Sequence, residues 1–271
     1  MLPEVLNQEQ KVSEAFSKQS PVFDEADAKN EILQWMRAKV RAHALSLWKP
    51  REHILELNAG TGLDAIYFAQ KGFYVYATDN APGMLQIIEK KIKELQLEDN
   101  ITTQQCSFLQ LDKLDRKKFN HIFSNFGGVN CTDKLEDVIK SFDKLLKPGG
   151  TVTLVIMPPT CLWEILFAFK GNFKLAFRRL QKNGTPSHLE GLNFTAWYYS
   201  PTRVAEMFGK EYSILSTTGL GITVPPPFME DFPVKHPKAF ERLKSMENSI
   251  AKKAPFNSWG DHFIISAKKL S

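Results

Sequence analysis

Short apolar runs alternate with amphipathic helical patterns through the first 157 residues. The runs are brief and bounded by turn residues, as expected of strands, and cover residues 54–57, 74–78, 121–125 and 151–156. A further strand is expected at residues 101–105. Between them, apolar side chains recur every three or four positions, which predicts helices, over residues 64–71, 84–95 and 135–145. This alternation predicts a parallel sheet with helices on both faces.

The N-terminal segment has a different pattern. Residues 1–22 are polar and weakly patterned, whereas apolar side chains recur at helical spacing from Ile32 to Leu47. Asp24 to Asp27 can cap this helix, which should end before Pro50. We expect the helix to pack on the sheet and the segment before it to fold over the bound ligand.

The regular alternation stops after residue 157. Apolar residues from Leu162 to Leu180 form one helical stripe, with Lys170, Lys174 and Arg178 on the other side. Further on, strands are expected at residues 193–199, 212–217 and 262–267, and helices at 201–208 and 237–250. The chain has 271 residues, and we expect it to form a single domain. Its parts are a cap over residues 1–50, a ligand-binding core over 51–157, an insertion over 158–205, and C-terminal strands and a helix over 206–271.

A glycine turn follows the first expected strand. Gly60 and Gly62 suit a turn in which the backbone bends sharply and a ligand approaches closely. The second expected strand ends in Asp79, where a carboxylate can accept hydrogen bonds from ribose hydroxyls. Together with Ala65, the turn also fits the dinucleotide fingerprint, so a nicotinamide-dependent oxidoreductase is one hypothesis.

The same turn fits a second spacing, Glu56-x-Asn58-x-Gly60-x-Gly62, which resembles the first motif of class I S-adenosylmethionine-dependent methyltransferases. Asn58 stands where that family usually has its first glycine. Residues 79–85 resemble the family's D-x-S-x-x-M-L stretch, and Lys-Pro-Gly-Gly precedes the fifth expected strand as it does in the family. Stretches typical of quinone- and biotin-pathway methyltransferases are similar to residues 15–25 and 125–130.

The resemblance implies a seven-stranded, mostly parallel Rossmann-like sheet with helices on both faces and an antiparallel last strand. The helical patterns outside it add an N-terminal helical cap and a helical lid inserted after the fifth strand. It implies S-adenosyl-L-methionine as cofactor and S-adenosyl-L-homocysteine as product. By matching positions, the implied cofactor-binding residues are Glu56, Asn58, Ala59, Gly60, Thr61, Gly62, Asp79, Asn80, Met84, Cys106, Ser107, Phe108, Asn125 and Phe126. Cys106 replaces an aspartate that binds the adenine amino group, so Ser107 or a backbone carbonyl is expected to serve there.

Methyl transfer from a sulfonium is an in-line displacement that needs positioning and desolvation, and no metal. We expect a small apolar or aromatic acceptor, which can be lipid-like. Oxygen or carbon acceptors also lose a proton, and the candidate bases are His188, Tyr198, Tyr199 and His262. A protein that binds the cofactor without turnover is the remaining hypothesis, because Asn58, Cys106 and Asn120 depart from the family pattern.

Charge is unevenly distributed. Residues 1–157 contain 20 Lys and Arg against 21 Asp and Glu, whereas residues 158–271 contain 15 against 9. The basic half should face an anionic substrate or lipid headgroup, so residues 162–182 are either a lid over the acceptor or a membrane-contact helix. No nucleic-acid-binding motif is present. Cys106, Cys131 and Cys161 lack metal-like spacing and indicate free thiols, and the N-terminus lacks a signal pattern, so we expect a cytoplasmic protein.

Overall fold

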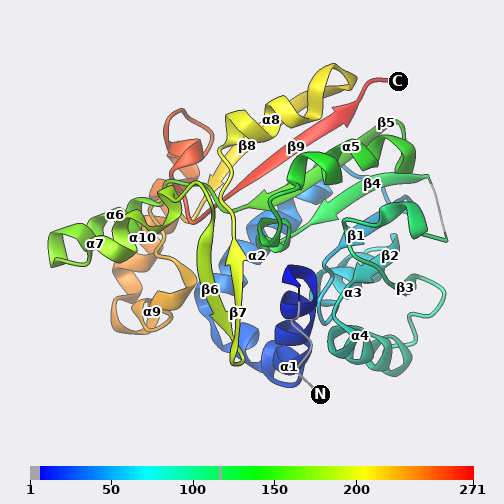
Figure 1. The fold of residues 1–271 in the computed structure, drawn as a ribbon, viewed down its shortest axis with the longest axis horizontal. Helices are drawn as coiled ribbons and strands as arrows, with labels where there is room; N and C mark the ends of the chain where they lie inside the picture. Colours follow the sequence, from blue (N-terminus) through cyan, green and yellow to red (C-terminus); the bar gives the residue numbers. More distant parts are fainter. Residues whose placement is uncertain (1–6, 116–117) are drawn as a thin grey trace.

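The computed structural model describes residues 7–115 and 118–271 and contains a seven-stranded sheet in the order β3-β2-β1-β4-β5-β9-β8 (Figure 1). Its strands are β1 (His53–Leu57), β2 (Tyr74–Asp79), β3 (Ile101–Gln105), β4 (Phe119–Ser124), β5 (Leu146–Ile156), β8 (Tyr212–Leu220) and β9 (His262–Lys269). Strands β3, β2, β1, β4 and β5 pair in parallel, and β9 is antiparallel to both β5 and β8. The predicted mostly parallel sheet with an antiparallel last strand is confirmed.

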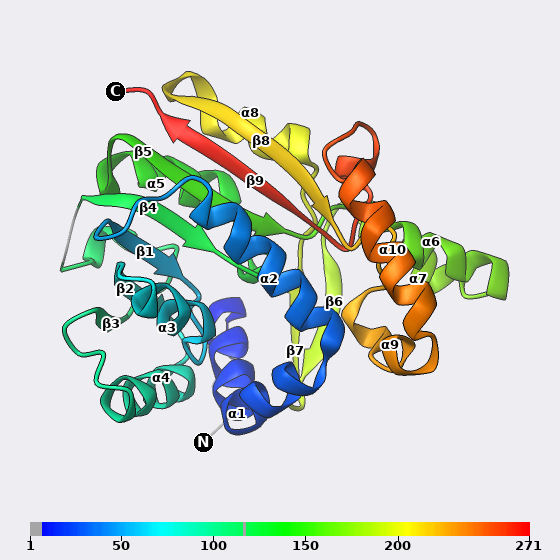
Figure 2. The same ribbon diagram turned by 180° about the vertical axis from the view of Figure 1, so that it is seen from behind.

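Helices cover both faces of the sheet, as Figure 2 shows for α2 and α3 on one face. The longer helices are α2 (Glu31–Leu45), α3 (Leu63–Gln70), α4 (Pro82–Glu94), α5 (Leu135–Leu145), α8 (Pro201–Phe208) and α10 (Pro237–Ile250). Alternate strand residues bury against different helices: Ile54 packs with α2 and α3, whereas Leu55 and Leu57 pack with α5 and α8. This division follows from the two-residue period of a strand, and it gives the sheet two separate apolar cores.

The N-terminal segment is more ordered than its sequence predicts. Helix α1 (Gln8–Lys29) begins at a capping box in which Asn7 and Gln10 bond each other's backbone, and it contains Pro21. The expected cap at Asp24 to Asp27 is wrong, because these residues lie inside α1. Asn30 caps α2 instead, where its side-chain oxygen accepts from the N–H groups of Ile32 and Leu33 at 3.1 Å. Most residues of α1 are polar and its few apolar residues are widely spaced, so the helix was not predicted.

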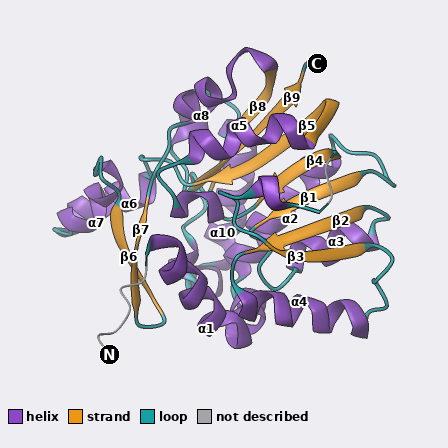
Figure 3. Ribbon diagram, turned by 45° about the vertical axis from the view of Figure 1, so that its right-hand side comes forward, coloured by secondary structure: helices purple, strands orange, loops and turns teal. Residues whose placement is uncertain are grey.

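The insertion after β5 is broken into short pieces rather than one helix. It consists of α6 (Leu162–Leu166), η3 (Phe167–Lys170), α7 (Phe173–Phe177), η4 (Arg178–Leu180) and a hairpin of β6 (Thr185–Leu189) and β7 (Leu192–Ala196). Gly171 ends η3 with a left-handed φ of 77°, which breaks the expected stripe. Strand β6 was not predicted, since its polar residues lack a strand pattern. Figure 3 shows the hairpin and α7 standing beside the main sheet.

The C-terminal half completes the sheet and adds short elements between β8 and α10. These are η6 (Pro227–Met229) and α9 (Phe232–Lys235), and the remaining single turns are η1 (Leu111–Lys113), η2 (Gly128–Cys131), η5 (Gly209–Glu211) and η7 (Phe256–Ser258). Among the described helices, none combines the length and the apolar composition that spanning a bilayer requires.

Candidate functional site

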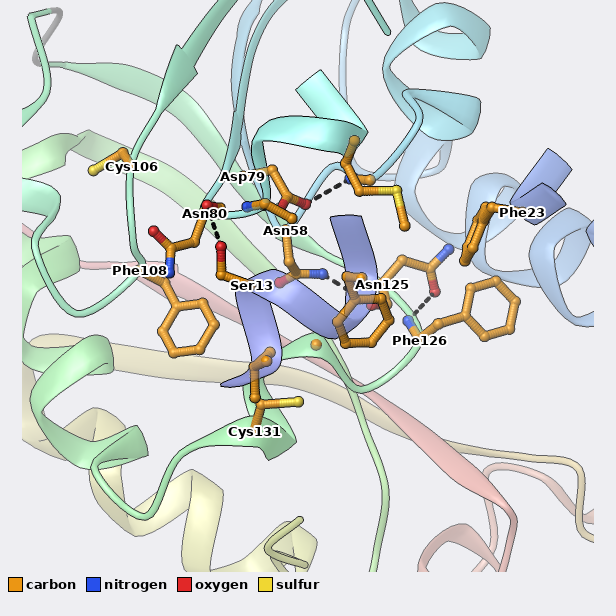
Figure 4. A pocket seen from close by; sticks show the side chains of 16 residues that line it. Ser13, Phe23, Asn58, Asp79, Asn80, Cys106, Phe108, Asn125, Phe126 and Cys131 are labelled. Carbon is orange, nitrogen blue, oxygen red and sulfur yellow. Dashed lines mark hydrogen bonds between the residues drawn. The ribbon is translucent and has the colours of Figure 1, made fainter. Parts of the chain in front are cut away.

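A cavity of about 180 Å³ lies at the carboxyl ends of β1, β2 and β4, beneath α1 (Figure 4). Ligands of open α/β sheets bind at this edge. Nine of the residues predicted to bind the cofactor line it: Asn58, Gly60, Asp79, Asn80, Met84, Cys106, Phe108, Asn125 and Phe126. Figure 4 shows Phe108 on one side of the cavity and Phe23 and Phe126 on the other, so its walls are mainly apolar.

Asp79 is fixed at the cavity wall by its own backbone surroundings. Its Oδ2 accepts the N–H of Gly60 at 2.8 Å, and its Oδ1 accepts the N–H of Ala81 at 2.8 Å. Burial raises the pKa of Asp79, although these backbone N–H groups oppose the rise by stabilising the carboxylate. A carboxylate has about four lone-pair sites, so two backbone bonds leave acceptor capacity for hydroxyls of a ligand.

Asn58 occupies the position at which the resemblance predicts glycine, and it adopts a left-handed backbone conformation that favours glycine. Its φ is 47°, a left-handed conformation that asparagine tolerates better than most residues. The side-chain Oδ1 accepts from the Ser124 hydroxyl at 2.7 Å, and Nδ2 donates to the Asn125 carbonyl at 3.3 Å. The amide therefore connects the tips of β1 and β4. It fills the space beside Gly128, where an added Cβ would lie 2.2 Å from the Asn58 Cγ.

A buried charge network lies behind the cavity wall. Asp64 accepts from Arg37 and Arg41, each at 2.7 Å, and from the Asn125 amide at 2.8 Å. Burial alone would raise the pKa of Asp64, but the two guanidinium groups outweigh burial and lower it. Glu56 has the opposite shift, because burial and the charge of Asp64 hold its pKa well above the usual range. Its Oε2 is buried without a hydrogen-bond partner among the described residues.

The tip of β4 presents an amide and an aromatic ring to the cavity. The Asn125 Oδ1 accepts the N–H of Phe126 at 2.8 Å, and Phe126 has a left-handed φ of 47°. The guanidinium of Arg37 lies 4.6 Å from the centre of the Phe126 ring. Such a cation–π contact holds the ring face in place. Asn125 and Phe126, two predicted site residues, are therefore fixed by the same network that holds Asp64.

Several cavity residues were missed at the level of sequence, and most belong to α1. Val12, Ser13, Phe16 and Phe23 line the cavity. The Ser13 hydroxyl donates to the Asn80 carbonyl at 2.9 Å. The signal was present, because Val12, Phe16 and Phe23 are spaced four and seven residues apart, on one face of a helix.

Helix α1 is held over the cavity by close contact with α4. An added Cβ on Gly83 would lie 2.6 Å from the Ser17 carbonyl oxygen, and the Gly83 N–H bonds the Ser17 hydroxyl at 3.2 Å. At its other side α1 packs on β7, where the Gln8 side chain donates to the Thr195 carbonyl at 2.8 Å and accepts its N–H at 3.1 Å. The cavity roof is therefore attached to both the core and the insertion.

Five predicted cofactor residues lie behind the cavity wall rather than in it: Glu56, Ala59, Thr61, Gly62 and Ser107. The Ser107 hydroxyl donates to Glu9 of α1. The Cys106 thiol lines the cavity but bonds the carbonyls of Ser107 and Gln110 at 3.4 Å, and burial raises its pKa. The expected adenine contact through Ser107 would therefore compete with Glu9.

Three of the four candidate bases lie away from the cavity. His188 is on the exposed β6 strand. The Tyr199 hydroxyl donates to the Thr132 carbonyl at 2.5 Å, and the Tyr198 ring lies 5.2 Å from the Arg179 guanidinium. Burial raises the pKa of both tyrosines, so neither hydroxyl becomes a base near neutral pH.

His262 lies directly behind the cavity wall. It begins antiparallel β9, which places it at the edge where the parallel strands end. Its ring meets the ring of Phe126 edge to face, with centroids 5.9 Å apart, and an added Cβ on Gly127 would lie 3.3 Å from its Nε2. The Nδ1 is 2.9 Å from Asp261 Oδ2, and Asp261 in turn accepts from Arg179 at 2.6 Å.

The carboxylates around Arg179 form a second buried charge network. Arg179 donates to Glu164 at 2.7 Å and Arg178 donates to the same carboxylate at 2.6 Å. Burial opposes ionisation of Asp261, but His262 and Arg179 outweigh it and lower the pKa of this carboxyl. Cys161, Glu164 and Asp261 have ligand-type atoms within 4.8 Å of one another. Two guanidinium groups already neutralise these carboxylates, which disfavours a cation there.

Part of the chain matches a known protein family. Residues 54–150 match the family described as "Methyltransferase domain". A demethylmenaquinone methyltransferase of Symbiobacterium thermophilum is 28% identical over 161 residues, which cover 55% of this chain and 59% of that protein. The chain thus spans less than two thirds of this curated relative.

Two solved structures share the fold. A putative S-adenosylmethionine-dependent methyltransferase of Listeria monocytogenes superposes with a TM-score of 0.61 at 17% identity, over 87% of this chain and 99% of that one. A phosphoethanolamine N-methyltransferase of Haemonchus contortus, solved with phosphomonomethylethanolamine and S-adenosylhomocysteine, superposes with a TM-score of 0.60 at 14% identity. That match covers 100% of this chain and 62% of the other.

Proposed function

We propose that this chain, whose fold and family match are those of the class I S-adenosylmethionine-dependent methyltransferases, transfers a methyl group from S-adenosylmethionine to a small apolar or aromatic acceptor. The resemblance predicted from the motifs is confirmed by the family match over residues 54–150 and by the strand order. The comparisons support S-adenosylmethionine as the cofactor and S-adenosylhomocysteine as the product. The observation that carries the proposal is the Asp79 carboxylate, fixed at the end of β2 in the wall of the cavity.

The residues around the cavity fit this cofactor. Asp79 has acceptor capacity for ribose hydroxyls, and Met84 and Phe108 offer apolar surface for an adenine ring. Gly60 lines the cavity, and an added Cβ would lie 4.0 Å from the Met84 sulfur, in space that a ligand could use.

The bound cofactor supplies a methyl group that a positively charged sulfur already activates. The protein then needs to align the acceptor and exclude water, and alignment alone is worth about 7–11 kcal/mol. Helix α1 closes one side with Phe16 and Phe23, and the β4 tip closes another with Phe126. These apolar walls support an apolar or aromatic acceptor, which can be lipid-like.

His262 is the candidate base that the geometry favours. When Nδ1 donates to Asp261, Nε2 is the ring nitrogen that can accept a proton, and it lies beside Gly127 and Phe126. Arg179 fixes Asp261 from the other side and so orients the ring. We assign to His262 the removal of a proton from an oxygen or carbon acceptor.

The strand order favours a methyltransferase over a nicotinamide-dependent oxidoreductase. A dinucleotide-binding sheet of six parallel strands runs 3-2-1-4-5-6, whereas here antiparallel β9 is inserted between β5 and β8. We propose a cytoplasmic reaction, which the three free cysteines support.

Two measurements test the proposal. Titration calorimetry with S-adenosylhomocysteine and with NAD⁺ should give saturable heat for the first ligand only. Incubation with isotopically labelled S-adenosylmethionine and fractionated cell extract should then transfer label to a small-molecule fraction. Binding of NAD⁺ alone would contradict the cofactor assignment. Tight binding of S-adenosylhomocysteine without transfer to any fraction would instead support a protein that binds the cofactor without turnover.

A further inference from the structure

We propose that one end of the molecule is a docking surface for an anionic lipid bilayer. This surface, called the tip below, consists of residues 162–182 (α6 to η4) and 227–235 (η6 and α9). The tip projects from the end of the molecule farthest from β3 (Figure 1). The proposal does not rest on the proposed function, because binding to a bilayer requires neither cofactor nor acceptor.

The tip exposes an unusual amount of apolar side chain. Seven of the fourteen exposed large hydrophobic residues among the described residues lie on it: Leu166, Phe169, Phe173, Phe177, Leu180, Phe228 and Val234. Phe169 is 88% exposed, Val234 81% and Phe173 62%. Every exposed phenylalanine of the described chain is therefore found here. A concentration of exposed apolar side chains in two neighbouring segments is typical of an interaction site.

Aromatic contacts join the two segments of the tip into one surface. The ring centroids of Phe167 and Phe228 are 6.1 Å apart, and those of Trp163 and Phe232 are 6.0 Å apart. At its base the tip is held by Arg179, which joins Glu164 of α6 to Asp261 before β9. The exposed rings are thus presented by an anchored projection.

The exposure follows from how the chain turns at Gly171. A continuous helix would place the whole stripe from Leu162 to Leu180 on one face, which could pack on the sheet. The left-handed φ of 77° at Gly171 instead ends η3, and α7 starts after the N-cap of Asn172. Phe169 on one side of the break and Phe173 on the other consequently both face solvent.

The charge of the tip is complementary to anionic lipid. In residues 162–182 the single acid, Glu164, is buried and paired with Arg178 and Arg179, so its charge is neutralised. Lys170, Lys174 and Lys182 add positive charge to the same segment. In the second segment Asp231 pairs with Lys235 at 2.7 Å, and the exposed Glu230 adds one negative charge, so the tip keeps a net positive charge. Lysines beside exposed aromatic rings are the composition of interfacial membrane-binding segments.

A second copy of the chain fits this surface less well. A symmetric dimer through the tip would bring the same lysines of the two copies close together, and like charges at an interface are repulsive. The tip is also a projection rather than a groove, which suits insertion of side chains between lipid headgroups. The bilayer is therefore the occupant that the charges and the shape favour.

Sedimentation with vesicles tests the proposal. The protein should cosediment with vesicles of phosphatidylglycerol and phosphatidylcholine, and added salt should weaken the binding. The double substitution Phe169→Ser/Phe173→Ser should reduce partitioning by about 10-fold or more. The matched control Val22→Ser/Leu95→Ser, which removes two exposed apolar side chains elsewhere, should leave partitioning unchanged.

A second variant separates the charge from the apolar contribution. Lys170→Gln/Lys174→Gln should weaken binding to the anionic vesicles and have little effect on vesicles of phosphatidylcholine alone. Circular dichroism should show that all variants remain folded. The proposal is overturned if the unmodified protein stays in the supernatant with anionic vesicles. It is also overturned if light scattering shows a dimer that Phe169→Ser/Phe173→Ser converts to a monomer.

Discussion

Arg37 in α2 and Arg179 in η4 are both buried, and each bridges two carboxylates from different elements. Arg37 joins Asp27 of α1 to Asp64 of α3, and Arg179 joins Glu164 of α6 to Asp261 before β9. A second arginine supports each pair, Arg41 in the first network and Arg178 in the second. Both networks attach a segment outside the sheet to the carboxyl edge of the sheet.

The two networks differ in the group that they direct toward the cavity. Asp64 accepts from the amide of Asn125, a neutral group suited to hydrogen bonding a ligand. Asp261 is paired with the imidazole of His262, a group suited to accepting a proton. The same arrangement of buried charges therefore supports binding on one side of the cavity and, as proposed, proton transfer on the other.

The largest expected effect is the fall in the rate of methyl transfer in His262→Gln. Loss of a general base typically reduces the rate by about 10²–10⁴-fold, while titration calorimetry should give an unchanged affinity for S-adenosylhomocysteine. The matched control is His188→Gln on the exposed hairpin, which should keep both the rate and the affinity. A full rate of labelled methyl transfer in His262→Gln would remove His262 from the mechanism.

Next in size is the effect of breaking either network on stability. Arg37→Met and Arg179→Met each remove a buried guanidinium that two buried carboxylates share, and breaking a buried ion pair in this way typically costs about 3–5 kcal/mol. Denaturant unfolding would measure the loss. Arg203→Met is the control, since this arginine is exposed and its ion pairs should contribute about 1 kcal/mol or less. Equal losses in all three variants would show that the buried networks contribute no special stability.

A smaller effect is expected from Asp79→Asn, which keeps the shape of the side chain but removes its charge. Hydrogen bonds to a charged group contribute about 1.5–3 kcal/mol, so affinity for S-adenosylhomocysteine should fall by roughly 10- to 100-fold. Asp112→Asn in η1 serves as the matched control, with no change expected. Unaltered affinity in Asp79→Asn would contradict the proposed position of the cofactor.

The smallest expected effect is on the free energy of unfolding at acidic pH. The pKa of Asp64 and that of Asp261 are lowered in the folded chain, so their contribution to stability is present above the unfolded pKa of about 4 and is lost as pH falls below it. The free energy of unfolding should thus decrease from about pH 5 to about pH 3. Asp64→Asn should show a shallower decrease in the same denaturant titrations. An identical slope would indicate that other carboxylates dominate.

Much of the fold could be predicted because its elements carry strong periodicity. Helix α10 has the expected bounds, because its apolar residues recur at helical spacing after Pro237. Strand β3 also has the expected bounds, although its sequence Ile-Thr-Thr-Gln-Gln contains a single apolar residue. Strand β6 was missed, because its sequence Thr-Pro-Ser-His-Leu has almost no apolar face and pairs only with β7. The stripe from Leu162 to Leu180 has helical periodicity, yet it does not form one helix, because the left-handed conformation of Gly171 breaks the segment into short helices.

Some residues of the candidate site could also be predicted from the sequence, whereas others could not. Asp79, Gly60 and Asn125 could be predicted because strand ends of a parallel sheet meet at one edge. The segment before α2 was expected to fold over the ligand, but its lining side chains were not identified, since docking of this mostly polar helix depends on distant contacts such as Ser17 with Gly83 and Gln8 with Thr195. Tyr198, Tyr199 and His188 were proposed as candidate bases, but none of the three lines the cavity.

The contact between Asn58 and Gly128 makes the order of substitutions matter. A side chain at residue 128 would collide with the Asn58 amide, so Gly128→Ala should be harmful in the present chain. The same change should be tolerated once Asn58→Gly has removed the amide, and Asn58→Gly alone loses only the bonds to Ser124 and Asn125. A lineage that reaches alanine at residue 128 must therefore first change residue 58, so mutational history as well as chemistry limits which pairs can occur.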